Sequence, residues 1–179
     1  MRRHLILVGL VITLGGLGWS VAQKEAVLAD GETVLLQLAP VDPRSLMQGD
    51  YMVLNYQLER ALRKHYDSTV PGVDTGGLED GVAVLKLDEK KVATLVRIDD
   101  GTELAKGEVF LRYTRYRQRF GSRFKIGAES FFFQEGTGSV FDQARYGELK
   151  LDKRGASVLI GLRDKDTRIL GAEQRLHKP

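Results

Sequence analysis

The sequence of 179 residues contains no cysteine, only four prolines and only three histidines. Without cysteine the chain can form no disulfide, no thiolate metal site and no thiol nucleophile. His4, His65 and His177 are scattered, and no carboxylate cluster shows ligand spacing around them. The sequence also lacks a G-x-S-x-G nucleophile elbow. We therefore expect no metal, no cofactor and no assigned catalytic residue.

The net charge is low once the N-terminus is set aside. The formal charge is +3, from 27 basic and 24 acidic residues, and Arg2 and Arg3 supply two of those positive charges. The rest of the chain is almost neutral, so its basic isoelectric point is no signature of nucleic-acid binding. We expect no nucleic-acid partner.

A long uncharged segment follows these two arginines. Residues 5–22 form eighteen positions without a charge, near the lower limit for crossing the hydrocarbon core of a bilayer. Basic residues before such a segment favour a cytoplasmic N-terminus and export of the chain after it. The sequence predicts a single-pass signal anchor over 1–23, held by the lipid bilayer of the inner (cytoplasmic) membrane through residues 5–22, and a periplasmic or otherwise extracytoplasmic domain over 24–179. A cleaved signal peptide ending at Ala22 is the alternative.

The exported part has the pattern of a small α+β domain. Short apolar runs bounded by Gly, Asp and Lys turns predict mostly antiparallel strands. Two short helices are expected, one over 55–66 and one near 139–144 with Ser139 as its N-cap. Polar connectors are expected over 24–31 and 67–80. The fold class is therefore a single α+β domain of mostly antiparallel sheet with two short helices, behind one N-terminal transmembrane helix.

Two neighbouring segments carry the most distinctive residues. Residues 40–46 read P-V-D-P-R-S-L and residues 49–56 read G-D-Y-M-V-L-N-Y. Asp50 can accept hydrogen bonds from turn amides and could pair with Arg44, while Asp42 can cap its own loop. Alternation along the strand places Tyr51 and Tyr56 on opposite faces. An architectural role is favoured, with a ligand site as the alternative.

Residues 49–56 match letter for letter the motif that names the GDYXXLXY family of membrane-anchored proteins. The P-x-D-P-R segment and the run F-F-F-Q-E-G-T-G over 131–138 also resemble that family's pattern. The resemblance implies an N-terminal anchor and a partner among multi-spanning membrane proteins. It implies no reaction, because the family is functionally uncharacterised and has no assigned catalytic residues.

A basic run forms a second candidate surface. Residues 111–125 contain six basic residues and no acidic residue. Residues two apart on a strand share a face, so Arg115, Arg117 and Arg119 are expected to form one charged row. Such a row suits an acidic partner, such as a lipid headgroup, a glycan or a protein loop. The alternative is a solvated face whose arginine stems cover aromatic rings.

These features favour a non-enzymatic, membrane-anchored accessory domain that binds another membrane or envelope component. A hydrolase using Asp42, Asp50 or Glu135 is one alternative, and a small-anion or peptide-binding module near 136–139 is another. The candidate binding residues are Asp42, Arg44, Asp50, Tyr51, Tyr56, Arg115, Arg117, Arg119 and Glu135.

Overall fold

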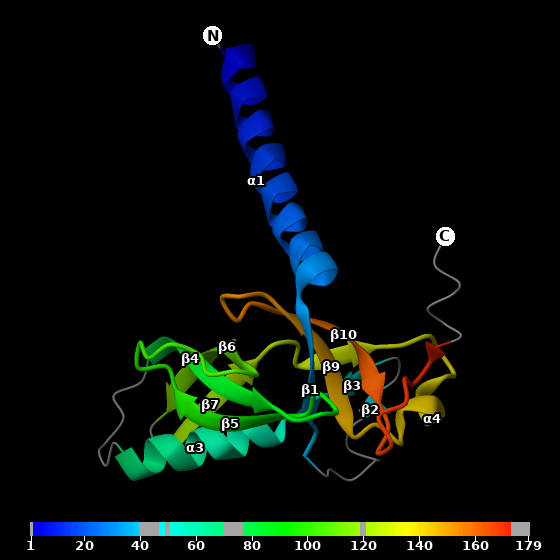
Figure 1. Ribbon diagram of the computed structural model, residues 1–179. Helices are drawn as coiled ribbons and strands as arrows, with labels where there is room; N and C mark the ends of the chain where they lie inside the picture. The colour runs from blue at the N-terminus through cyan, green and yellow to red at the C-terminus, as the bar shows by residue number, and fades with distance from the viewer. Residues whose placement is uncertain (1, 40–46, 49–50, 70–76, 119–120, 173–179) are drawn as a thin grey trace.

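The computed structural model describes the chain except residues 1, 40–46, 49–50, 70–76, 119–120 and 173–179. A long helix, α1 (Arg2–Asp30), rises from a domain made of short strands (Figure 1). Asp42, Arg44, Asp50 and Arg119 lie outside the described residues, and their predicted roles stay predictions.

In the described part of the chain the strands form three antiparallel sheets. The first has the order β1 (Glu32–Gln37), β9 (Tyr146–Leu151), β10 (Ser157–Arg163). The second has the order β2 (Met47–Gln48), β3 (Tyr51–Val53), β8 (Ser130–Phe132). The third has the order β5 (Ala93–Ile98), β4 (Gly77–Leu87), β6 (Glu108–Gln118), β7 (Gly121–Ile126). The predicted α+β class with mostly antiparallel pairing is confirmed.

One hydrophobic core joins these sheets. Fully buried side chains come from the first sheet, the third sheet and both short helices, and include Val34, Leu62, Leu85, Leu111, Phe141 and Leu149. Burying one such side chain contributes about 1.5–3 kcal/mol. The described parts of the three sheets therefore share one hydrophobic core.

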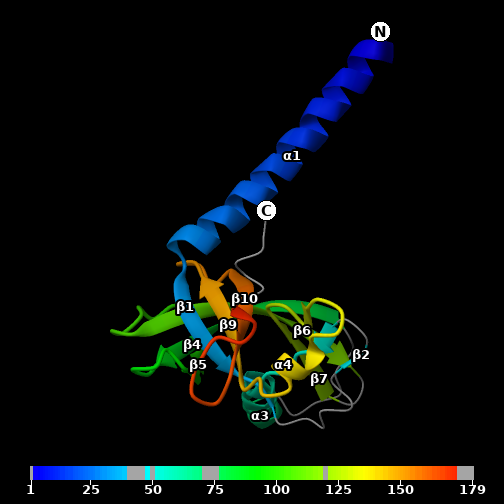
Figure 2. The same ribbon diagram turned by 90° about the vertical axis from the view of Figure 1, so that its right-hand side faces the viewer.

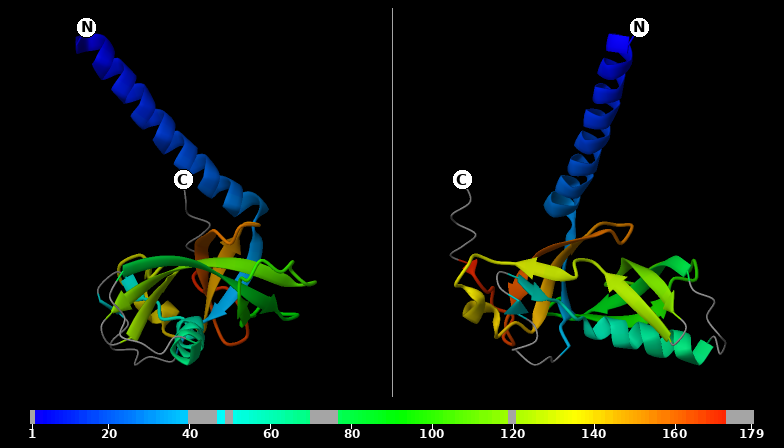
Figure 3. Two further views of the ribbon diagram at one scale, coloured as in Figure 1. Left: turned by 90° about the vertical axis from the view of Figure 1, so that its left-hand side faces the viewer. Right: turned by 180° about the vertical axis from the view of Figure 1, so that it is seen from behind.

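Helix α3 (Gln57–Thr69) follows the motif strand closely. Leu58 and Leu62 are buried one turn apart, and the helix lies along the third sheet (Figure 3). This confirms the short amphipathic helix expected from the spacing of its leucines. Helix α4 (Gly138–Phe141), at the other end of the domain, is a single turn. Its N-cap is Thr137, so the prediction of Ser139 as N-cap is wrong.

Helix α1 is longer than expected. The predicted polar connector over 24–31 is helical as far as Asp30, because no glycine or proline interrupts it before Gly31. The Gly31 amide then donates to the Val27 carbonyl at 3.0 Å. A Cβ at Gly31 would lie 2.2 Å from that oxygen, so the close approach requires glycine.

The apolar side chains of α1 are exposed. Ile12 is 69% exposed and Trp19 is 71% exposed, whereas Val27 is buried against the domain. Among the helices in the described part of the chain, none combines the length and apolarity needed to cross a membrane. The transmembrane assignment of residues 5–22 is therefore not supported by the structure.

Candidate functional site

Two adjoining hollows lie beside the end of the motif strand. One, of about 740 Å³, runs along α3, and the other, of about 300 Å³, lies between α3 and β7. Both are lined by Asn55, Tyr56, Glu59 and Arg63. We call the two together the α3 groove. The motif thus contributes its last four residues, Val53 to Tyr56, to the lining of this groove, and the last two of them line both hollows.

The motif strand builds this groove through strict alternation. Met52, Leu54 and Tyr56 are buried, while Asn55 is exposed. The Tyr56 hydroxyl donates to the Ala128 carbonyl at 2.9 Å, and burial raises the pKa of this phenol. A buried phenol with a raised pKa stays neutral near pH 7. Through its hydrogen bond, Tyr56 connects the motif to the segment before β8.

Charged side chains line the groove in pairs. Arg63 donates to Glu59 at 3.1 Å, one helical turn away, and Arg123 donates to Glu129 at 3.2 Å. Each of these carboxylates is therefore paired with a guanidinium. Exposed pairs of this kind contribute only about 0–1 kcal/mol to stability and can exchange partners. The lining of the α3 groove is therefore polar and charged.

The basic strand differs from the prediction. Residues 112–117 do lie on an extended strand, β6, but Arg115 is only 8% exposed. Its Nε donates to Ser122 Oγ at 2.8 Å, and its guanidinium carbon lies 4.1 Å from the centre of the Tyr66 ring. The predicted exposed row is therefore wrong at Arg115, because α3 covers that face of the sheet.

Arg115 belongs to an aromatic cluster that the sequence did not reveal. Tyr66 and Tyr113 share a hydrogen bond of 2.7 Å between their hydroxyls, and both rings contact Phe124. Burial raises the pKa of Tyr113. Glu79 lies 3.3 Å from Arg115 and balances its charge. The helical spacing of Tyr66 with Leu62 was the one available signal that this face is covered.

The remaining described candidates do not converge. Tyr51 is half-buried, with its ring centre 5.6 Å from that of Phe132. Arg117 is partly buried at the end of β6. Glu135 is exposed in the turn before α4, and α4 and α3 lie at opposite ends of the domain (Figure 1). Of all the candidate residues in the described part of the chain, only Tyr56 lines the α3 groove, and nothing in the structure tests a binding role for any of them.

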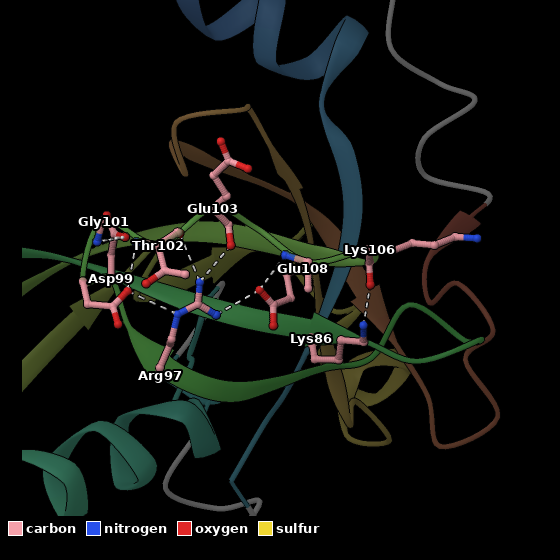
Figure 4. Close-up of polar contacts among 10 residues, drawn as sticks. Lys86, Arg97, Asp99, Gly101, Thr102, Glu103, Lys106 and Glu108 are labelled. Carbon is pink, nitrogen blue, oxygen red and sulfur yellow. Dashed lines mark hydrogen bonds and ion pairs between the residues drawn. The ribbon is translucent and has the colours of Figure 1, made fainter.

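A polar cluster secures the connection between β5 and β6. These two strands flank β4, so the connecting residues cross over it (Figure 4). Arg97 donates to Glu108 at 2.9 Å and to the Thr102 carbonyl at 3.2 Å. The Ala105 amide, and secondly Arg97, lower the pKa of Glu108. Sequence reasoning missed this cluster, which stabilises a crossover loop rather than forming a site.

Metal binding finds no support in the described residues, where no group of three or more histidines and carboxylates is placed to hold an ion.

The fold and the groove define the class: an α+β domain of antiparallel sheets, with an N-terminal helix and a polar groove beside one short strand. A family model described as "GDYXXLXY protein" matches residues 13–162. The chain therefore belongs to the GDYXXLXY family, as the motif predicted. No curated protein and no solved structure matches the chain.

Proposed function

We propose that this protein is a membrane-attached binding domain. Helix α1 sits in the lipid bilayer, the domain lies on the extracytoplasmic side, and the α3 groove binds a polar segment of another membrane or envelope protein. The role is accessory rather than catalytic.

The observation that carries the proposal is the exposure of α1. Leu10, Ile12 and Leu17 are each at least half exposed, although the domain beside them has a complete core. Folded proteins rarely leave so much contiguous apolar surface in water. The uncharged run over 5–22 has no polar face that would favour lying flat on a membrane, so lipid on all sides is the environment that suits it.

Charge supports the orientation. Arg2 and Arg3 precede the apolar run, and Lys24 and Glu25 after it cancel. This asymmetry favours a cytoplasmic N-terminus. Because the chain has no cysteine, single-cysteine variants can report topology without background labelling. Glu103→Cys should react with a membrane-impermeant maleimide in intact cells, and Arg3→Cys only after permeabilisation.

Membrane attachment has its own test. The full chain should stay in the membrane pellet after alkaline carbonate extraction. A soluble species starting at Gln23 would instead establish the cleaved signal peptide.

Binding in the groove follows from its lining. Arg60, Arg63, Lys64 and Arg123 face it together with the carboxylates of Glu59, Asp67 and Glu129. The two signs are almost balanced, so the groove suits a polypeptide segment that itself carries both charges, and its affinity should fall with salt. Hydrolysis has less support, because Glu135 does not line this groove.

Crosslinking tests this part of the proposal. Asn55→Cys carrying a photo-crosslinker should capture a membrane protein in cells, and Glu103→Cys should not. Equal capture from both positions, or capture from neither, would remove the groove from the proposal. Both residues are exposed, so the two variants should fold alike.

A further inference from the structure

A second cavity lies at the base of α1. It has a volume of about 520 Å³ and lies between the last turns of the helix and the β9–β10 hairpin, whose tip is next to the helix end in Figure 2. Four basic residues line it against two acidic ones: Lys24, Arg112, Lys153 and Arg154, with Asp30 and Asp152. We call it the basal cavity.

The hairpin is held firmly in place. One oxygen of Asp152 accepts the amides of Arg154 and Ala156, each at 2.8 Å. Arg112 on β6 donates its backbone amide to the Gly155 carbonyl at 2.8 Å and its Nε to the Arg154 carbonyl at 3.0 Å. The side chains of Lys153 and Arg154 are exposed at this fixed tip. One carboxylate oxygen of Asp152 is thus engaged within the turn.

The cavity lies at the level where a membrane surface would be. Trp19 is exposed one helical turn before Gln23, which lines the cavity. Tryptophan favours the headgroup layer of a bilayer, and lysine and arginine near that layer attract anionic lipids. Lys24 and the hairpin tip would then meet the phosphate layer together.

We propose that the basal cavity binds the phosphate-bearing headgroup of an anionic phospholipid. This inference rests on the proposed attachment of α1 to a membrane. The basic residues of the basal cavity could also bind free phosphate. Because the cavity lies against the membrane-attached helix, however, a lipid headgroup is the phosphate group that lies nearest to it. Headgroup binding would hold the domain upright on the membrane and so fix the direction in which the α3 groove faces.

The test uses the full chain in nanodiscs of phosphatidylcholine, with or without phosphatidylglycerol. Gln23→Cys carries a fluorophore, and a trace of lipid with a spin-labelled headgroup quenches it. Labelled phosphatidylglycerol should quench more than labelled phosphatidylcholine. The double variant Lys153→Glu, Arg154→Glu should remove this preference, since each basic residue lost should weaken association with the anionic lipid about fivefold.

The other end of β10 offers a matched control. There Asp164 accepts the amides of Asp166 and Arg168, each at 2.8 Å, just as Asp152 does in the hairpin. The double variant Lys165→Glu, Arg168→Glu changes the net charge equally and should keep the lipid preference. Loss of the preference in both double variants would show an effect of net charge alone and overturn the inference.

Two further measurements distinguish failure of the proposed membrane attachment from failure of the headgroup site. Trp19 is the only tryptophan, so its quenching by lipids brominated on the acyl chain reports insertion of α1 independently. Without that quenching the proposed membrane attachment fails. With it, but without a preference for phosphatidylglycerol, only the headgroup site fails. Inorganic phosphate that abolished the preference at low concentration would identify free phosphate as the ligand and also overturn the inference.

Discussion

Helices α1 and α3 place their leucines in opposite environments. In α3, Leu58 and Leu62 are buried and the charged residues face solvent, whereas in α1, Leu14 and Leu17 remain about 60% exposed. Both segments are helical, so helix formation does not distinguish them. The difference lies in the pattern. A helix with one apolar stripe packs on its own domain, whereas the apolar side chains of α1 have no such stripe and stay exposed.

The largest expected effect tests this contrast directly. Leu62→Ala should lower the free energy of unfolding by about 2–5 kcal/mol, because the cavity it leaves is fully enclosed. Leu14→Ala should change it by less than about 0.5 kcal/mol, since an exposed side chain contributes little to the core. Chemical denaturation in detergent measures both. A comparable loss for Leu14→Ala would mean that α1 is part of the folded unit.

The next largest effect concerns the hairpin between the two regions. Gly155 has φ +80°, and a Cβ there would lie 2.9 Å from the amides of Arg112 and Leu111. Gly101 has a similar φ of +82° but nothing within 4 Å. Gly101→Ala should cost about 1–2 kcal/mol from the left-handed backbone alone. Gly155→Ala should cost clearly more, and equal melting temperatures would show that the hairpin is not pressed against β6.

A smaller effect concerns the motif itself. Tyr56→Phe removes the donor to the Ala128 carbonyl and should cost about 1 kcal/mol. Tyr116→Phe, on the partly exposed face of β6, should stay within about 0.5 kcal/mol. Thermal denaturation of the two variants measures the difference. If Tyr56→Phe kept full stability but lost crosslinking from Asn55→Cys, the tyrosine would belong to the binding function rather than to the fold.

The periodicity of apolar residues predicted those strands and helices whose structure depends mainly on their own sequence. The alternation of Met52, Leu54 and Tyr56, and the helical stripe of α3, are both set by which side chains can reach one core. The length of α1 was underestimated because polar residues were taken as the end of a helix, although only Gly31 ends it.

Features that depend on how elements meet were not predictable from one sequence. Arg115 is buried because α3 covers its face of β6, and strand β7 was not predicted from the sequence. The Arg97 cluster exists only because the chain crosses over β4 between β5 and β6. Such contacts join residues by topology, which periodicity does not encode.

The smallest expected effect is on how the stability of the domain falls with pH. Residues 5–22 carry no charge, so they cannot contribute to this pH dependence. Hydrogen bonds from the Ala105 amide and from Arg97 lower the pKa of Glu108 in the folded state. A lowered pKa means that the unfolded chain takes up the proton first as the pH falls. The contribution to stability is therefore complete above roughly pH 4.3, the ordinary pKa of glutamate, and disappears as the pH falls through the folded value.

Glu108→Gln should consequently flatten the fall of the melting temperature between about pH 6 and pH 3. Glu103→Gln should leave that fall unchanged, because Glu103 contributes only its backbone carbonyl to the cluster. Identical acid profiles for wild type and Glu108→Gln would show that the crossover loop is held by backbone contacts alone.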